Sequence, residues 1–308
     1  MTTYRILSLD GGGIRGVLTA TILEKLDEAN PGFMNDMDLI VGTSTGGILA
    51  LAIASGLCPT QVRELYVRLG KKVFVHKDII QKIPGIGQLF EADYPNEPLK
   101  EELTAQFGEK TLGDLQKQVL ISSFDLDNGS TDIRRPRIWK PKFFHNFPGS
   151  DSDRDQKVVD VALRTSAAPT YFPIYQGFID GGVIANNPSM CALAQALHPI
   201  TGRQKLKDIR LLSVGTGSNP KYLTGLNNNW GLVKWAPHLI GLMMGGSEGL
   251  ADYQCAQILG THYKRINPIL PAEIGLDQVD QIQLMETLAV EFDISDAISW
   301  VKQKIVQR

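Results

Sequence analysis

The sequence has few cysteines, no recognisable leader segment and no long apolar run. Its 308 residues include only three cysteines, and no two of them form a C-x-x-C pair. This argues against a disulfide-stapled scaffold and favours a reducing compartment. The N-terminus lacks a basic segment followed by an apolar one, and the apolar stretch 48–58 is about half of the ~20 residues that a membrane-spanning helix needs. We therefore expect a soluble, cytoplasmic protein.

Neither sign of charge dominates the sequence. The chain has 31 Lys and Arg residues against 33 Asp and Glu, a formal net charge of −2. A nucleic-acid-binding protein would show a basic domain, so nucleic acid is not an expected partner. Hydrophobic residues make up 43% and charged residues 21%, which is typical of a folded domain and excludes disorder, coiled coil and collagen.

Short apolar runs alternate with helix-like stretches along the first half of the chain. Alternation of this kind indicates βαβ units and a parallel sheet covered on both faces. We predict an α/β fold with three α/β/α layers and a mainly parallel central sheet. The predicted strands are 4–9, 38–41, 119–124, 175–179 and 209–214, and the predicted helices are 17–30 and 47–55.

No linker, low-complexity tract or repeat divides the chain, so we predict a single domain over 1–308. The catalytic core is expected at about 4–217, because all three motifs described below lie there. Residues 77–109 are expected to form short helices and loops. Residues 218–308 are expected to be peripheral helices that complete the same domain, with one or two closing helices between 280 and 307.

The segment Gly42-Thr-Ser44-Thr-Gly46 fits the G-x-S-x-G pattern of a nucleophile elbow. It follows an apolar strand and opens an apolar helix, as that turn requires. Glycines leave room where a strand turns sharply into a helix, and the helix N-terminus favours a developing negative charge. A glycine-rich turn with an N-capping serine is the alternative. We predict that Ser44 is a nucleophile and that Gly42 and Gly46 support the turn.

A second glycine-rich segment, Asp10-Gly-Gly-Gly-Ile-Arg-Gly16, follows the first predicted strand. Read as G-x-G-x-x-G, it is also the fingerprint of a dinucleotide-binding oxidoreductase, which is the rival interpretation. That fingerprint expects an acidic residue after the next strand, whereas Asp38 stands before it and Gly42 after it. The other use of consecutive glycines is to direct their N–H groups at a substrate carbonyl oxygen.

The residues alone do not decide which base would activate the serine. The sequence contains five histidines, His76, His145, His198, His238 and His262. None of them sits at a strand end beside glycines, so surface or capping roles are expected for each. Asp180 is the other candidate, because it ends an apolar approach and is followed by Gly181 and Gly182. A hydrogen-bonded turn aspartate is the alternative for that position.

Taken together, the three glycine corners resemble those of the patatin-like phospholipase family, of the bacterial and plant patatin type. The family carries a D-G-G-G-x-[RK]-G loop, a G-x-S-x-G elbow and a D-G-[GA] motif. This sequence has them in the same order at 10–16, 42–46 and 180–182. The segment 165–173 is also similar to the one that leads to the family's aspartate. The resemblance is strongest over 4–217.

The resemblance implies a calcium-independent lipid acyl hydrolase of the phospholipase A type that works through an acyl-enzyme and needs no cofactor. Ser44 would be the nucleophile, Asp180 the general base, and the amides of Gly11, Gly12 and Gly13 the oxyanion hole. An aspartate can act as this base only where burial raises its pKa. The resemblance also implies supporting roles for Asp10, Arg15, Gly16, Gly42, Gly46, Gly181 and Gly182.

Several alternatives stay open at this point. Arg15 could hold the loop, meet a phosphate or act directly on the substrate. An acyltransferase would use the same two residues with another alcohol in place of water. A dinucleotide-binding oxidoreductase and a catalytically silent lipid-binding module belong to other functional classes.

Two further segments bear on metals and membranes. Asp151, Asp153 and Asp155 are spaced like the start of a calcium loop, but the later glycine and glutamate positions are not filled, so no metal site is predicted. Large apolar side chains surround glycines in 230–244. This segment is either a wall or flap that touches lipid or, alternatively, an ordinary helix buried against the core. We expect a lipid ester substrate that the protein meets by transient peripheral contact with a membrane or micelle.

Overall fold

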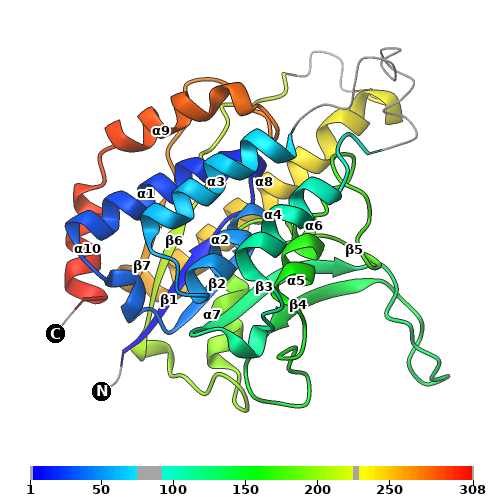
Figure 1. Cartoon of the computed structure of the whole chain (residues 1–308), viewed down its shortest axis with the longest axis horizontal. Helices are drawn as coiled ribbons and strands as arrows, with labels where there is room; N and C mark the ends of the chain where they lie inside the picture. Colours follow the sequence, from blue (N-terminus) through cyan, green and yellow to red (C-terminus); the bar gives the residue numbers. More distant parts are fainter. Residues whose placement is uncertain (1–2, 75–91, 225–228, 307–308) are drawn as a thin grey trace.

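The computed structural model describes residues 3–74, 92–224 and 229–306, and these fold around one seven-stranded sheet (Figure 1). The strand order is β4-β3-β2-β1-β6-β7, and β5 pairs with β3 outside this path. The pairs from β3 to β7 along the path are parallel, whereas β4 and β5 are antiparallel to β3. The strands are β1 (Tyr4–Leu9), β2 (Leu39–Thr43), β3 (Gln118–Asp125), β4 (Lys140–His145), β5 (Phe178–Asp180), β6 (Ile209–Val214) and β7 (Tyr263–Ile266).

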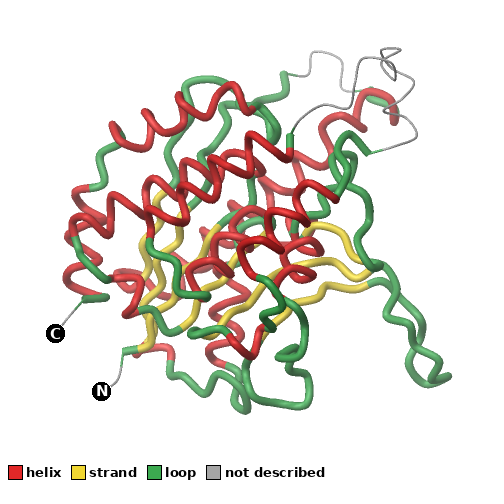
Figure 2. The backbone as a smooth tube through the Cα atoms, viewed as in Figure 1, coloured by secondary structure: helices red, strands yellow, loops and turns green. Residues whose placement is uncertain are grey.

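Helices cover both faces of this sheet, so the predicted three-layer α/β/α arrangement is confirmed (Figures 1 and 2). Alternate residues of the strands point to opposite faces. In β1, for example, Leu7 packs in one core cluster with α1, α2, α3 and α9, whereas Ile6 packs in the other with α7 and α8. The helices are α1 (Gly16–Ala29), α2 (Thr45–Ala54), α3 (Pro59–Val73), α4 (Glu97–Phe107), α5 (Val158–Thr165), α6 (Gly182–Ala185), α7 (Ser189–Leu197), α8 (Leu232–Leu259), α9 (Ile282–Glu291) and α10 (Ser295–Lys304).

The burial of helix α2 accounts for its apolar sequence. All ten of its residues are buried, because the helix lies between the sheet and the surrounding helices. A helix that is buried all round is apolar all round and shows no amphipathic pattern. This accounts for the run of alanine, leucine and isoleucine after Gly47.

The structure corrects the predicted element list in four places. The edge strand β4 was not predicted, and β5 covers 178–180 rather than 175–179. Residues 218–308 are not helices alone, because β7 adds a strand to the sheet beside β6. Helix α4 is longer than the short helices expected there, while residues 75–91 lie outside the described part. Packing of α9 on α1 and of β7 on β6 supports the proposal of one domain.

The carboxyl ends of β1, β2 and β6 meet at one edge of the sheet. Asp10 follows β1, Ser44 follows β2, and Thr216 lies two residues beyond β6. Because neighbouring parallel strands end together, these three loops are brought side by side. The Thr216 hydroxyl donates a hydrogen bond to the Gly11 carbonyl oxygen at 2.9 Å, which joins the first and third loops.

Candidate active site

Ser44 stands at a sharp turn between β2 and α2. Its backbone has φ 53° and ψ −121°, a conformation that residues other than glycine rarely adopt. A Cβ at Gly42 would come within 2.1 Å of the Gly46 carbonyl oxygen, and one at Gly46 would lie 2.2 Å from the Leu9 carbonyl oxygen. Backbone-to-backbone contact therefore explains both glycines of the G-x-S-x-G pattern. The turn places Ser44 directly before the first turn of α2.

Thr165, at the end of α5, holds this turn. Its hydroxyl oxygen accepts a hydrogen bond from the Ser44 backbone N–H at 2.9 Å and donates one to the Ser122 carbonyl oxygen at 2.5 Å. No role for Thr165 is predicted from the sequence. A contact between residues that lie so far apart along the chain leaves no local pattern.

Asp180 reaches Ser44 through the register of three strands. Thr43, at the end of β2, pairs with Ser122 in β3. The next residue of β3, Ser123, pairs with Asp180 in β5. The Ser44 hydroxyl lies within hydrogen-bonding reach of the Asp180 carboxylate and lowers the pKa of that group. The Gly182 N–H donates a hydrogen bond to the same carboxylate at 2.6 Å. The two side chains that the sequence suggested as nucleophile and base therefore lie beside each other.

The carboxyl group of Asp180 is buried, with 3% of the residue exposed. Burial raises its pKa from 3.8 to about 6, while the hydrogen bonds from Ser44 and Gly182 act in the opposite direction. A carboxylate with this pKa accepts protons better than an exposed aspartate and is still ionised at neutral pH. Chemically, this is the environment that a single-aspartate base requires.

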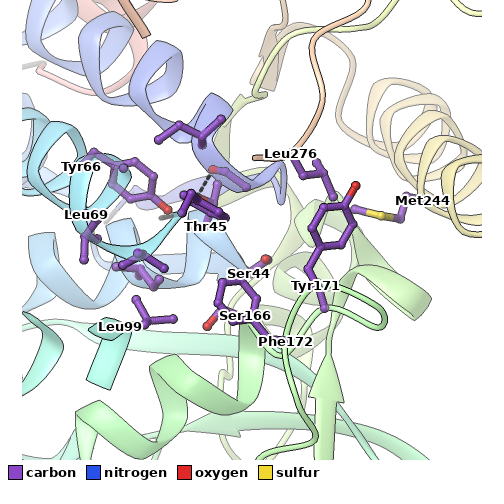
Figure 3. Close-up of a pocket in the computed structure, with 17 residues that line it drawn as sticks. Ser44, Thr45, Tyr66, Leu69, Leu99, Ser166, Tyr171, Phe172, Met244 and Leu276 are labelled. Atoms are coloured by element: carbon purple, nitrogen blue, oxygen red, sulfur yellow. Dashed lines mark hydrogen bonds between the residues drawn. The ribbon is translucent and has the colours of Figure 1, made fainter. Parts of the chain in front are cut away.

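The loop from Asp10 to Gly16 is tied to the Ser44 turn, because the Thr45 hydroxyl donates to the Gly13 carbonyl oxygen at 2.6 Å (Figure 3). The Gly11 N–H donates to the Asn186 carbonyl oxygen at 3.0 Å, so this amide is already occupied. The N–H groups of Gly12 and Gly13 have no acceptor within the described part of the chain. Two of the three predicted amide donors therefore remain free.

Glycine is required in this loop for two reasons. A Cβ at Gly12 would lie 2.2 Å from the Thr216 hydroxyl oxygen. Gly13 has φ 58°, in the left-handed region, and a Cβ there would lie 2.2 Å from the Leu276 carbonyl oxygen. The run of three glycines thus follows from close approach and backbone conformation together.

Arg15 points into the protein rather than toward solvent. Its Nη1 donates to the Gly217 carbonyl oxygen at 2.9 Å and its Nε to the Gly12 carbonyl oxygen at 3.3 Å. Of the roles considered for Arg15, these contacts favour holding the glycine loop. Gly16 is in close contact with α3, because a Cβ there would come within 2.5 Å of the Tyr66 ring. Gly181 packs against Ser122 in the same way, with a Cβ distance of 2.3 Å to the hydroxyl oxygen.

A pocket with mainly apolar walls opens beside Ser44 (Figure 3). Its walls come from the glycine loop, α2, α3, α4, the segment after α5, and α8. Such a surface suits a hydrocarbon chain, because burying apolar area is favourable and the walls offer few polar groups that would be left unpaired. The labelled lining residues are Ser44, Thr45, Tyr66, Leu69, Leu99, Ser166, Tyr171, Phe172, Met244 and Leu276.

Comparison with known proteins places this arrangement in a family. The family model described as "Patatin-like phospholipase" matches residues 7–193, more than half of the chain. The chain belongs to the patatin-like phospholipase family. A "cGAMP-activated phospholipase" of Pseudomonas aeruginosa is 32% identical to it over 86% of this chain and 78% of that protein.

Two relatives from eukaryotes extend the comparison. "Patatin-like protein 2" of Arabidopsis thaliana is 27% identical over 86% of this chain and 74% of that protein. The "85/88 kDa calcium-independent phospholipase A2" of Rattus norvegicus is 29% identical over 92% of this chain, which covers 38% of that longer protein. The patatin-like chain is therefore a hydrolase with a lipid substrate.

The family assignment displaces the oxidoreductase interpretation, and the position of Asp38 agrees with this. Asp38 stands before β2, at the edge of the sheet opposite the glycine loop, and its carboxylate accepts the Arg5 backbone N–H at 2.7 Å. A ribose bound at the glycine loop would need its acidic partner at the carboxyl end of that strand. This patatin-like chain has Gly42 in the corresponding place.

None of the described histidines lines the Ser44 pocket. His145 ends β4 beside Asp151, at 3.6 Å, and His262 lies beside Arg210. His198 caps the end of α7, and its Nδ1 lies 3.3 Å from the Thr201 backbone nitrogen. His238 lies near Trp230, and His76 falls outside the described residues.

Within the described ranges, no group of three or more His, Cys, Asp or Glu side chains could hold a metal ion. The acidic loop at 151–155 is occupied instead by hydrogen bonds: Asp153 accepts one from the Lys142 ammonium group at 2.6 Å and one from the His145 backbone N–H at 3.1 Å. Among the described helices, none combines the length and the apolar character of a segment that crosses a bilayer.

A buried charge cluster that the sequence analysis did not foresee supports the glycine loop. Asp10 is fully buried, and the Arg265 guanidinium of β7 donates to its carboxylate, with one N–O distance of 2.9 Å. Arg265 also donates to Glu248 of α8 at 3.0 Å, and Glu248 accepts the Asn186 side-chain amide at 3.2 Å. Burial raises the pKa of Asp10 to about 7, against the lowering effect of Arg265. The cluster links β1, β7, α8 and the residue that holds Gly11.

Replacing Arg265 with methionine is expected to lower the free energy of unfolding by about 3–5 kcal/mol at pH 8, because it leaves Asp10 buried without its partner. Protonated Asp10 contributes fully to the free energy of unfolding below about pH 4, which is near the pKa of an aspartate in the unfolded chain. This contribution is lost as the pH rises through about 7, the pKa of Asp10 in the folded protein. Without Arg265 this pKa rises further, so the loss at pH 5.5 is expected to be smaller. Urea unfolding at both pH values measures the difference.

The matched control for this prediction is the double variant Asp10→Asn with Arg265→Met. It removes both charges, so it should recover part of the stability at pH 8. An equal loss at pH 5.5 and pH 8 for Arg265→Met alone would mean that lost packing, and not the unpaired carboxyl of Asp10, causes the effect.

Proposed function

We propose that the protein is a phospholipase A-type acyl hydrolase in which Ser44 attacks the ester carbonyl and Asp180 is the only base. The observation that carries this proposal is the position of the Ser44 hydroxyl beside the buried Asp180 carboxylate. The family membership supports the reaction class, and the apolar pocket beside Ser44 supports an acyl chain as the group that is bound.

In the first half of the reaction, Asp180 takes the hydroxyl proton as the Ser44 oxygen forms a bond to the carbonyl carbon. The carbonyl oxygen becomes an oxyanion and is stabilised by the free N–H groups of Gly12 and Gly13 and by the N-terminal end of α2. Removing one donor of this kind typically costs about 10²–10³-fold in turnover. The occupied amide of Gly11 acts indirectly, by fixing the loop through Asn186.

In the second half, the tetrahedral intermediate collapses and the bond to the alcohol breaks. Asp180 returns its proton to the leaving lysolipid oxygen, which leaves an acyl group on Ser44. Water then attacks the acyl carbon while Asp180 accepts its proton. The bond between the acyl group and the Ser44 oxygen breaks, Asp180 passes the proton to that oxygen, and the fatty acid is released. The rat relative is named a calcium-independent phospholipase A2. We propose that this chain is calcium-independent as well, so chelation by EGTA should leave hydrolysis unchanged.

A fluorophosphonate probe tests the role of Ser44 directly, because it labels only an activated serine. Ser44→Ala is expected to abolish labelling and to lower hydrolysis of p-nitrophenyl butyrate by about 10³-fold or more. Mass spectrometry of phospholipid vesicles should show release of fatty acid and lysophospholipid by the wild type alone.

Ser166→Ala is the matched control, because Ser166 lines the same pocket but donates its hydroxyl to the Ala162 carbonyl oxygen at 2.7 Å. It is expected to be labelled and to hydrolyse the ester within about threefold of wild type, which corresponds to less than about 1 kcal/mol. Labelling that persists in Ser44→Ala and disappears in Ser166→Ala would assign the nucleophile to the other serine.

A further inference from the structure

The loop between β3 and β4 projects from the body of the protein, at the lower right of Figures 1 and 2. We call residues 126–142, which include the start of β4, the basic arm. It carries five basic side chains and two acidic ones. It also exposes large apolar side chains: Ile133 is 100% and Trp139 is 71% exposed. Exposed apolar groups of this size on a projecting loop indicate a binding surface.

The charges of the basic arm are only partly neutralised. Asp127 pairs with Arg137, and Asp132 pairs with Arg134. Within the described residues neither Arg135 nor Lys140, which lies across the β3–β4 ladder from Asp125, forms an ion pair, and both are exposed. The surface around Trp139 therefore keeps an excess of positive charge.

The basic arm leaves the sheet at the edge that carries the Ser44 pocket. It begins where β3 ends, and Asp125, the last residue of β3, pairs with Phe178, two residues before Asp180 in β5. The start of the arm therefore lies next to β5, the strand that positions Asp180, the proposed catalytic base. Because β3 runs parallel to β2, the arm extends from the same carboxyl-terminal edge of the sheet at which Ser44 follows β2.

The first half of α8 flanks the same pocket, since Met244 forms part of its wall. This stretch is not the buried helix considered as the alternative for 230–244. Leu232 is 78% and Val233 is 88% exposed, and residues 229–247 contain no Asp or Glu. In Figure 1 this end of α8 lies at the upper right and the basic arm at the lower right, so both extend from the same side of the sheet.

We propose that the basic arm and the first half of α8 dock the protein on an anionic phospholipid surface, with the Ser44 pocket facing that surface. Arg and Lys beside Trp and aliphatic side chains match the headgroup and acyl regions of such a membrane. The identity of the partner rests on the proposed function, because a bilayer presents the substrate of the pocket that these two segments flank. An acidic protein would match the charges of the arm but would not require the acid-free apolar half of α8.

The test uses the full-length chain with Ser44→Ala, so that vesicles stay intact during a flotation assay. The probes are vesicles of phosphatidylcholine alone and of phosphatidylcholine mixed with phosphatidylglycerol. The arm variant is Arg135→Glu with Lys140→Glu, and the control is Lys205→Glu with Lys207→Glu. The two control residues are exposed but precede β6, at the opposite edge of the sheet.

Binding to the anionic vesicles is expected to fall about twenty-fold or more in the arm variant, since each basic group near such a surface contributes about five-fold. The control pair should bind within about twofold of the parent, and added salt should weaken binding of the parent. Trp139→Ser should also weaken binding, and it removes no charge. In chains that retain Ser44, the arm variant should hydrolyse soluble p-nitrophenyl butyrate at the wild-type rate.

Equal vesicle binding by the parent, the arm variant and Trp139→Ser would overturn the docking proposal and leave the basic arm as a surface for an acidic protein. A parallel loss of soluble-ester hydrolysis would overturn it as well, because the arm would then act on the pocket itself. Failure of the Ser44–Asp180 proposal has a different signature. Soluble-ester hydrolysis would then survive Ser44→Ala, whatever the vesicles show.

Discussion

Asp180→Asn is expected to lower turnover of a soluble p-nitrophenyl ester by about 10⁴-fold, the size of effect seen when the acidic member of a serine triad becomes an amide. Asparagine keeps the shape of the side chain and can still meet the Ser44 hydroxyl and the Gly182 N–H. It cannot accept the proton that leaves Ser44. Stopped-flow or long-time-course assays of ester hydrolysis measure the loss, and fluorophosphonate labelling of Ser44 should slow in parallel.

The pH dependence of the wild type follows from the same carboxyl group. Asp180 must be ionised to act as a base, and its pKa is raised to about 6. Turnover should therefore fall about tenfold per pH unit below pH 6 and level off above it. The residual activity of Asp180→Asn should lack this acid limb, because the group that titrates is gone.

Asp180→Asn should raise the stability of the protein although it lowers its activity. A buried carboxyl with a raised pKa contributes stability below its unfolded pKa near 4, and this contribution is lost as pH rises through about 6. At pH 8 the wild type holds an ionised Asp180 in a buried site. Asp180→Asn is therefore expected to raise the free energy of unfolding at pH 8 by up to about 3 kcal/mol, with little gain at pH 4.

Asp160→Asn provides the matched control. Asp160 accepts hydrogen bonds from Tyr175 and Gln176 on the surface of α5 and does not line the Ser44 pocket. It should keep wild-type turnover and the same acid limb. If Asp180→Asn instead retained most of its activity, another group would have to be the base, and the aspartate-only mechanism would be wrong.

The elements nearest the site are the ones that the sequence predicts best. One contact that requires glycine at the Ser44 turn is local, because Gly42 meets Gly46, so a short pattern reports the turn. The motif at Asp180 is similarly local, because Gly182 donates to the carboxylate two residues before it. The meeting of Ser44 with Asp180 is different. It depends on strand register, so the residues alone left open whether Asp180 or a histidine would be the base, and only the family resemblance chose Asp180.

The interactions that the sequence did not reveal join distant segments. Arg265 reaches Asp10 from β7, a strand that was not predicted, and Glu248 reaches the same cluster from α8. Arg265 follows Lys264 in the short strand Tyr263–Ile266, and nothing in the sequence shows which of the two basic residues is buried against an acid. The edge strand β4 was missed for another reason. It begins with Lys140 and Pro141, which are exposed, and proline is tolerated in a strand only at an edge.

Helix α8 was hard to predict because its sequence disfavours a helix. Four glycines, at 241, 245, 246 and 249, and Pro237 lie within its 28 residues. Each interior glycine costs about 1 kcal/mol relative to alanine, and an interior proline removes a hydrogen bond. A Cβ at any of these four glycines would meet nothing within 4 Å. Packing does not require them, in contrast to the glycines around Ser44.

Gly46→Ala is expected to lower the free energy of unfolding by about 3 kcal/mol or more and turnover by about 10²-fold. The new Cβ would lie 2.2 Å from the Leu9 carbonyl oxygen and 2.6 Å from that of Asp10, so β1 and the glycine loop must move away from the Ser44 turn. This displacement separates the Gly12 and Gly13 amides from the substrate carbonyl. Thermal unfolding and ester hydrolysis measure the two effects.

Gly245→Ala makes the same chemical change where space is open, and the opposite sign is expected for stability. Its Cβ meets no atom within 4 Å, and Gly245 is exposed on α8. Alanine should therefore raise the free energy of unfolding by about 1 kcal/mol through helix propensity alone and leave soluble-ester hydrolysis unchanged. Destabilisation of similar size by both variants would contradict the argument, because the cost at Gly46 could then no longer be attributed to the contact between the Ser44 turn and the end of β1.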